Sequence, residues 1–311
     1  MALHPLPQMA GGLFLSDGGL ETTLVFLDRI ELPHFAAFVL LDDAFGLERL
    51  KQYYVPYLEL CAELPGAGFV LDTPTWRANP DWASHLGVDG ARLRSINVQA
   101  ARLMHSLRDR WAPRLTGPIV VSGVIGPRGD GYVAAAPGSV EDAAAYHTMQ
   151  AEALAAGDVD MLAAVTMTTS AEALGIALAA ERVGLPVAIS FTVETDGRLP
   201  NGESIGEAIE RVDASARPAY FAINCAHPTH FAHALDAAGP WAARIRGIRA
   251  NASTKSHAEL DESSELDIGD PSDLARRYRG LRSVLPSLNI LGGCCGTDWR
   301  HLRAVRDAWL V

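Results

Sequence analysis

Eight short apolar runs recur along the chain, separated by stretches that have the composition of helices. The runs lie at 12–19, 67–76, 118–127, 160–169, 186–194, 219–228, 244–253 and 288–297. Their apolar residues follow one another rather than alternating with polar ones, which is typical of strands buried on both faces in a parallel sheet. The stretches between the runs are rich in Ala, Leu and Glu, and the one at 170–184 ends at Gly184, as helices often do. Strands and helices therefore alternate.

Eight strand and helix units favour a closed barrel over an open sheet, because open doubly wound sheets usually contain fewer strands. We therefore predict an α/β fold of the (β/α)8 TIM-barrel type. A barrel of this kind often accounts for about 250 residues or more as one unit. We expect residues 1–311 to form a single barrel domain.

Charge and hydropathy exclude several classes of partner. The formal net charge is −11, and no stripe of Lys and Arg is present that could neutralise a phosphate backbone. The N-terminus lacks the pattern of a signal peptide, and no uninterrupted apolar run reaches about 18 residues. We expect a cytoplasmic monomer or small homo-oligomer that binds small molecules, and neither nucleic acid nor membrane.

Polar residues stand at the carboxyl ends of the eight runs. In a barrel these ends meet at one rim, where the active site forms. The residues are Asp17, Thr73, Thr75, Ser122, Thr166, Glu194, Asn224, Cys225, Asn251, Ser253, Cys294 and Cys295. The segments 20–66 and 253–273 are long for simple connections, and we expect them to form extended loops over this rim, either as lids or as exposed insertions.

Three of the four cysteines lie on the predicted rim. Cys225 ends the sixth run, while Cys294 and Cys295 end the eighth. Three protein ligands around zinc leave a fourth position for substrate, which is the catalytic arrangement. Glycines on both sides of the adjacent pair allow the backbone to bend so that both thiols reach one ion. A strained disulfide between neighbours, acting as a redox or zinc sensor without catalysis, is the alternative. The fourth cysteine, Cys61, is expected to be a small buried hydrophobe.

Motifs at three strand ends resemble those of the homocysteine S-methyltransferase family. They are Asp17-Gly18-Gly19, Asn224-Cys225 with Pro228, and the sequence GGCCGT at 292–297. Supporting matches lie at 73–75, 123–127 and 269–271, so the resemblance spans nearly the whole chain. The chain looks like the short, single-domain, zinc-dependent members of the family.

The resemblance implies both a reaction and a site. It implies a methyltransferase that moves a methyl group from a small sulfonium donor, such as S-methylmethionine, to homocysteine or a related thiol, forming methionine. Zn²⁺ would be bound by Cys225, Cys294 and Cys295, and would convert the acceptor thiol to a thiolate at neutral pH. In the family the aspartate matching Asp17 holds the amino group of the acceptor, and backbone N–H groups matching Gly18 and Gly19 receive its carboxylate.

One departure concerns the acceptor. Family members commonly end the fourth strand with a glutamate that contacts the substrate amino group, whereas this chain has Val165 in that stretch. Glu194, at the end of the fifth strand, could replace it or could be an exposed loop residue. Thr75 and Asn224 are further candidates for substrate contacts. A different thiol acceptor is therefore a second interpretation.

Another departure concerns the donor. Arg77 follows Trp76 where the family usually has an uncharged residue. A guanidinium repels a cationic methyl donor unless that donor also carries a carboxylate, as S-methylmethionine and dimethylsulfoniopropionate do. The ring of Trp76 could receive the sulfonium, a contact worth about 0.5–2 kcal/mol. In the alternative interpretation Trp76 belongs to the core and Arg77 faces solvent.

Overall fold

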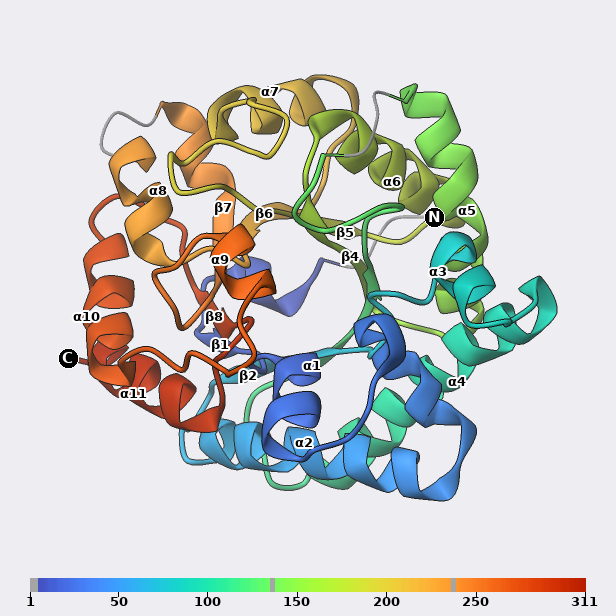
Figure 1. Ribbon diagram of the computed structural model, residues 1–311. Coiled ribbons are helices and arrows are strands. Elements are labelled where there is room, and N and C mark those ends of the chain that lie inside the picture. The colour runs from blue at the N-terminus through green and yellow to red at the C-terminus, as the bar shows by residue number, and fades with distance from the viewer. Residues whose placement is uncertain (1–4, 135–137, 236–238) are drawn as a thin grey trace.

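Eight parallel strands form a closed barrel inside a ring of helices (Figure 1). The computed structural model describes residues 5–134, 138–235 and 239–311. The strands are β1 Phe14–Leu15, β2 Gly68–Asp72, β3 Ile119–Ile125, β4 Met161–Met167, β5 Val187–Phe191, β6 Tyr220–Asn224, β7 Ile245–Ala250 and β8 Ile290–Gly293. Each lies within one of the eight predicted runs, and β1 pairs with β8 to close the barrel. The predicted fold class is confirmed.

Helices surround the barrel and connect its strands. They are α1 Leu20–Thr22, α2 Ala44–Ala62, α3 Pro80–His85, α4 Gly90–Trp111, α5 Val140–Ala156, α6 Ser170–Val183, α7 Ile205–Ser215, α8 Pro228–Leu235, α9 His257–Asp261, α10 Pro271–Leu281 and α11 Trp299–Trp309. Side-chain caps fix where many of them begin: Ser204 and Glu207 form a reciprocal capping box at α7. Gly184 ends α6 with a φ of 72°, as its glycine predicted.

The interior of the barrel changes from apolar to polar toward the carboxyl ends of the strands. The lower part is a cluster of apolar residues, which includes Phe14, Val70, Val120, Ala188 and Ile290. Side chains two residues apart on a strand point to the same face. Two residues beyond these apolar positions on β1, β2, β3 and β5 come Ser16, Asp72, Ser122 and Ser190. A polar layer therefore separates the apolar core from the rim.

The two segments predicted to form loops over the rim, 20–66 and 253–273, match that prediction only in part. In 20–66, residues 44–62 form the long helix α2, which belongs to the outer ring, so the loop prediction is wrong there. Its first part, including α1, does lie beside the cavity at the rim. The segment 253–273 contains the short helix α9, which lies over the barrel in Figure 1. Within the described ranges, none of the helices combines the length and apolar character that crossing a bilayer requires.

Candidate metal and substrate site

The three predicted thiols lie together at the rim. Cys225 follows β6, and Cys294 and Cys295 follow β8. Their sulfur atoms all lie within 4.8 Å of one another, and the Sγ atoms of Cys225 and Cys295 are 3.9 Å apart. The described ranges contain no other group of three His, Cys, Asp or Glu residues arranged this closely. Three thiol ligands in this spacing can hold one metal ion.

Unusual backbone conformations turn these thiols toward one another. Cys225 has a φ of 53° and Gly296 a φ of 77°, both in the left-handed region. The loop after β8 is also tied to β7, because the N–H of Cys294 donates to Ala250 and the carbonyl of Cys295 accepts from Ala252. The strand ends at Gly293, so the two adjacent cysteines no longer point to opposite faces. The bend predicted from the glycines is present.

The loop at Asp17, Gly18 and Gly19 packs directly against the cysteine loop. A Cβ on Gly19 would lie 2.6 Å from the carbonyl oxygen of Cys294, and a Cβ on Gly18 would lie 2.8 Å from that of Thr297. The N–H of Gly19 donates to Thr297, so this N–H is used within the protein. Both glycines therefore allow the first and last strand ends to approach closely.

The three thiols differ in acidity. Hydrogen bonds from the thiols of Cys225 and Cys295 hold the pKa of Cys294 well below its usual value, and nearby Arg249 lowers it further. The pKa of Cys225 is raised, mainly by its hydrogen bond to Cys294, and the pKa of Cys295 is raised by its hydrogen bonds with Cys225 and Cys294; desolvation adds to both shifts. The hydroxyl of Tyr132 lies 3.6 Å from the sulfur of Cys225 and 3.4 Å from that of Cys295. This tyrosine therefore covers the thiols from the side of the cavity.

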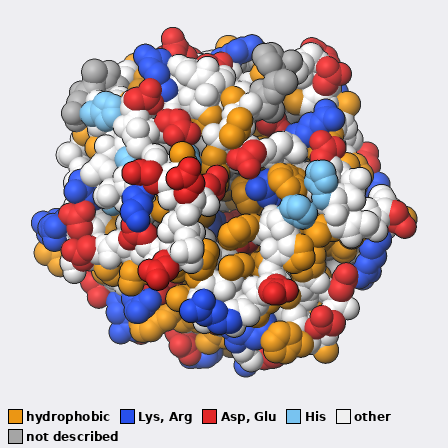
Figure 2. Space-filling model, viewed as in Figure 1, with side chains coloured by type: hydrophobic (Ala, Val, Ile, Leu, Met, Phe, Trp, Pro, Cys, Tyr) orange, Lys and Arg blue, Asp and Glu red, His pale blue; other side chains and the backbone are white. Residues whose placement is uncertain are grey.

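A cavity of about 610 Å³ opens above the thiols. Figure 2 shows the hollow at the centre of this face, with hydrophobic and acidic side chains around it. Seven acidic residues and two arginines line it: Asp17, Glu21, Asp72, Asp130, Asp261, Glu265 and Asp267, with Arg77 and Arg249. Burial raises the pKa of Glu21 to about 7. The lining carries an excess of acidic groups, which favours a cationic ligand.

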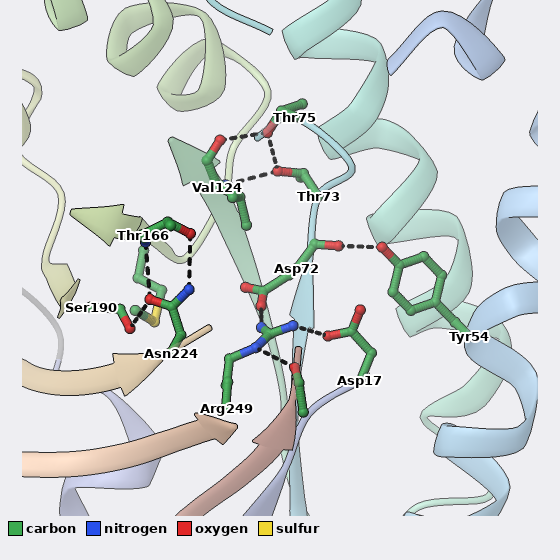
Figure 3. A network of polar contacts seen from close by, with 12 residues as sticks. Asp17, Tyr54, Asp72, Thr73, Thr75, Val124, Thr166, Ser190, Asn224 and Arg249 are labelled. Carbon is green, nitrogen blue, oxygen red and sulfur yellow. Dashed lines mark hydrogen bonds and ion pairs between the residues drawn. The ribbon is translucent and has the colours of Figure 1, made fainter. Parts of the chain in front are cut away.

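Asp17 lies at the floor of the cavity in an ion-pair cluster (Figure 3). Arg249 donates from Nη2 to Asp17 Oδ1 over 2.6 Å, and its Nη1 pairs with Asp72 Oδ2. Tyr53 donates its hydroxyl to Asp17 Oδ2 over 3.0 Å. Burial, opposed by Arg249 and reinforced by Asp72, raises the pKa of Asp17 to about 6. The carboxylate predicted to meet the substrate is thus already bonded at both oxygens.

Trp76 and Arg77 both line the cavity. The guanidinium of Arg77 stacks on Trp76 at 4.1 Å and on Trp82 at 3.7 Å from the ring centroids. Arg77 is only 8% exposed, and its Nη1 donates to the carbonyl of Gly129 over 3.2 Å. Burial lowers the pKa of Arg77, although nearby Asp130 opposes this. The interpretation in which Arg77 faces solvent is therefore wrong.

The remaining candidates have partners within the protein. Thr75 is fully buried, is absent from the cavity lining, and donates to the carbonyl of Val124. Asn224 lines the cavity, but its amide holds Thr166 and accepts from Ser190 (Figure 3). Glu194 is absent from the lining residues; its carboxylate lies 3.2 Å from Nδ1 of His257, whose Nε2 lies 2.5 Å from the carbonyl oxygen of Cys225. Glu194 therefore contacts a lining residue, His257, and does not itself line the cavity.

Sequence reasoning missed several lining residues, among them Glu21, Asp72, Tyr132, Arg249 and His257. One of them carried a signal in the sequence. Asp72 is a charged residue within an otherwise apolar run, and a charge inside a barrel strand needs a partner or a role. Arg249 is one of three arginines in the run at 244–253, so its charge did not stand out. Tyr132 lies on a loop and His257 begins α9, and their rings stack with centroids 4.2 Å apart. No pattern in the sequence marks that contact.

Comparisons with known proteins agree with this arrangement. The model of a family described as homocysteine S-methyltransferase matches residues 14–309. Homocysteine S-methyltransferase 1 of Brassica oleracea var. italica is 26% identical over 245 residues, covering 73% of this chain and 72% of that protein. The protein of the same name from Zea mays is 24% identical over 325 residues, covering 97% and 96%.

Solved structures share the fold. The oxidized form of the homocysteine methyltransferase MmuM from Escherichia coli superposes with a TM-score of 0.77 at 20% identity, over 98% of this chain and 99% of that one. The metallated form of the same protein gives a TM-score of 0.73 at 19% identity, over 96% of each chain. At this identity the two structures support the barrel fold.

Proposed function

This chain belongs to the homocysteine S-methyltransferase family, and we propose that it transfers a methyl group from a small sulfonium donor to homocysteine at a zinc site. Its class as a methyltransferase follows from the family. The observation that carries the zinc site is the meeting of the Cys225, Cys294 and Cys295 sulfur atoms within 4.8 Å, beside a cavity. The donor and the metal are proposals.

The donor set fits zinc. Thiolates are soft ligands that zinc accepts readily, and three protein ligands leave one position for a substrate. When bound, zinc would act as a Lewis acid that favours the thiolate form of the acceptor at neutral pH. Of the three thiols, Cys294 is the one whose pKa is lowered, so its thiolate form is suited to bind the cation first.

The charges around the cavity suit a cationic donor with a carboxylate. The acidic residues at the rim attract a sulfonium, and the ring of Trp76 can lie against it. Arg77, held between two indole rings, makes no ion pair with the described residues, so a donor carboxylate can take that place. S-methylmethionine has both groups.

The chain's own residues must also make room for the acceptor. The hydroxyl of Tyr132 occupies space beside the sulfur atoms of Cys225 and Cys295. An acceptor thiol that reaches the same place must displace this hydroxyl. Tyr132 stacks on His257, the first residue of α9, so displacement of the hydroxyl would also disturb that contact.

The domain organisation, the cellular location and the product are proposed on the same basis. Because the first strand, β1, pairs with the last, β8, neither can complete the barrel without the other, which supports residues 1–311 as one domain. We also propose that the protein acts in the cytoplasm, where thiols stay reduced, and that its product is methionine.

The test combines metal content with a transfer assay. Purified protein should contain about one zinc per chain, and should methylate homocysteine from S-methylmethionine, with S-adenosylmethionine, dimethylsulfoniopropionate and betaine as competing donors. Cys225→Ala should lose both zinc and transfer. Cys61→Ala is the matched control, because Cys61 is fully buried away from the cavity.

The same assay separates the alternatives. Protein without zinc, or full transfer by Cys225→Ala, would refute the proposal. Transfer to other thiols but not to homocysteine would favour a different acceptor. A reversible disulfide between Cys294 and Cys295, with no transfer to any thiol, would favour the redox sensor.

A further inference from the structure

The carbonyl oxygen of Cys225 is held by side chains from three different parts of the barrel. Nε2 of His257 lies 2.5 Å from it, Nδ2 of Asn251 donates to it over 3.1 Å, and Oγ1 of Thr192 donates to it over 3.5 Å. The N–H of Cys225 in turn donates to the carbonyl of Arg249 over 3.1 Å. Both backbone polar groups of this cysteine are therefore fixed by neighbours.

Cys225 needs this support because its backbone conformation is unusual. Its φ of 53° lies in the left-handed region, which a residue with a Cβ adopts only at an energetic cost. A residue in such a conformation persists only where its surroundings hold it there. The same conformation brings its Sγ to 3.9 Å from that of Cys295. The contacts of the carbonyl oxygen therefore bear directly on where the sulfur lies.

His257 is held in one orientation by two oxygen atoms. It is the first residue of α9, and its side chain is only 6% exposed. Because a carbonyl oxygen only accepts, Nε2 carries the hydrogen that points at Cys225. On the other side of the ring, Nδ1 lies 3.2 Å from Oε1 of Glu194, in the loop after β5. If the ring were turned over, carbon atoms would face both oxygens, so Glu194 and Cys225 favour the same orientation.

One face of the same ring packs against Tyr132. The two ring centroids are 4.2 Å apart, and the ring planes are inclined by 33°. The hydroxyl of Tyr132 lies 3.4 Å from Sγ of Cys295. His257 therefore contacts the thiol site twice, at its edge through the carbonyl of Cys225 and at its face through Tyr132.

We propose that His257 is a positioning residue of the metal site and that Glu194 orients its ring. Nε2 of His257 holds the turn at Cys225 in the conformation that brings the three sulfur atoms within 4.8 Å of one another, and its ring holds Tyr132 over them. The inference deepens the zinc site of the proposed function and rests on it. It gives Glu194 a role in the site through His257, without contact with the substrate.

Two substitutions separate the two contacts of His257. Glutamine can place a side-chain N–H near the position of Nε2 but has no ring, whereas phenylalanine has a ring but no hydrogen to donate. His257→Phe should weaken zinc binding at least about tenfold, as loss of a partner behind a metal ligand usually does. His257→Gln should keep the zinc affinity near the wild-type value. Competition of the full-length protein with a chelating dye measures both.

Alkylation of the reduced, metal-free protein by iodoacetamide should give the opposite order. His257→Gln releases Tyr132, so the thiols should react severalfold faster than in wild-type protein. His257→Phe keeps the stacking contact and should react at nearly the wild-type rate. Cys61 is fully buried, so the fast phase of the reaction reports on the rim thiols.

His230→Phe is the matched control. His230 is also 6% exposed, and its Nε2 lies 2.9 Å from the backbone carbonyl oxygen of Thr254, which holds no thiol. This variant should keep both the zinc affinity and the alkylation rate of wild-type protein. Glu194→Ala should weaken zinc binding, though less than His257→Phe does, because the ring can still reach Cys225.

Several results would overturn the inference. A purely structural role for His257 predicts that His257→Phe and His257→Gln weaken zinc binding equally. Wild-type affinity in His257→Phe, or an equal loss in His230→Phe, would show that the contact with Cys225 does not position the thiols. Wild-type affinity in Glu194→Ala would remove the role of Glu194.

Failure of the proposed function gives a different result. If zinc binding follows the expected order of variants but no methyl group is transferred, the proposed function fails and the positioning role stands. If wild-type protein binds no zinc, the proposed function and the metal-positioning role fail together, and the alkylation rates still decide whether His257 holds Tyr132 over the thiols.

Discussion

Substitution of Gly19 by alanine should damage the metal site without replacing a cysteine. The added methyl carbon would lie 2.6 Å from the carbonyl oxygen of Cys294, whereas ordinary contact begins at 3.4 Å, so the loop must move by about 0.8 Å. It would also lie 2.4 Å from Thr22 Oγ1, which accepts the N–H of Gly296 in the same loop. Both clashes push on the segment that carries Cys294 and Cys295.

The expected loss of zinc affinity is larger than the loss of stability. Overpacking of this kind costs about 1–3 kcal/mol of unfolding free energy. Metal–ligand distances tolerate only about 0.2 Å, so a displacement several times larger should weaken zinc binding at least about tenfold. Competition with a chelating dye measures the affinity, and denaturant unfolding of the metal-free protein measures the stability.

Gly12→Ala is the control for this experiment. Gly12 lies just before β1, the strand that leads to Gly19, and a Cβ on Gly12 would meet nothing within 4 Å. It should retain the zinc affinity of wild-type protein. If Gly19→Ala also retained that affinity, the contact between the first and last strand ends would not position the cysteines, and the reasoning would fail.

Three other changes test the site and its support. Arg77→Leu should raise KM at least about tenfold for S-methylmethionine, while KM for trimethylsulfonium, which has no carboxylate, stays near the wild-type value; equal effects on both donors would contradict the role of Arg77. Burial raises the pKa of Glu21 to about 7, so the contribution of Glu21 to stability is present at low pH and is lost as pH rises through neutrality. Glu21→Gln should make the unfolding free energy less dependent on pH between about 4.5 and 7. An unchanged pH profile would contradict this role of Glu21. Although burial opposes it, hydrogen bonds from His301 and Arg300 hold the pKa of Asp298 well below its usual value. The contribution of Asp298 to the stability of the fold is therefore present above about pH 4 and is lost on acidification. Asp298→Asn should destabilise the protein by about 1–2 kcal/mol at pH 7 and by less at pH 3, as thermal unfolding at the two pH values would show.

The strands and the thiol cluster were predictable because each depends on a local pattern. Every strand lies in an apolar run that needed no knowledge of its neighbours. The cysteines end two such runs, and the barrel rule brings strand ends together. The helix at 44–62 was missed, because the long segment around it was interpreted only by its length.

The polar contacts of the site were not predictable, because they depend on side chains far apart in sequence. Arg249 is 177 residues from Asp72 and 232 from Asp17, and only closure of the barrel sets the three together. Glu194 lies beyond the end of β5 at Phe191, and its carboxylate faces His257. Position at a strand end places a residue near the rim, and its rotamer then decides which partner it meets.

The pairing of β1 with β8 also sets when the site can form during synthesis. Domains emerge from the ribosome N-terminus first. A nascent chain that has passed β7 holds Asp17 and Cys225, while the loop with the other two thiols is still to be made. All three thiols can therefore bind the metal together only late in synthesis, after β8 and the loop that follows it have been made. A chain truncated before β8 would leave a single thiol at the rim, too few to retain the ion.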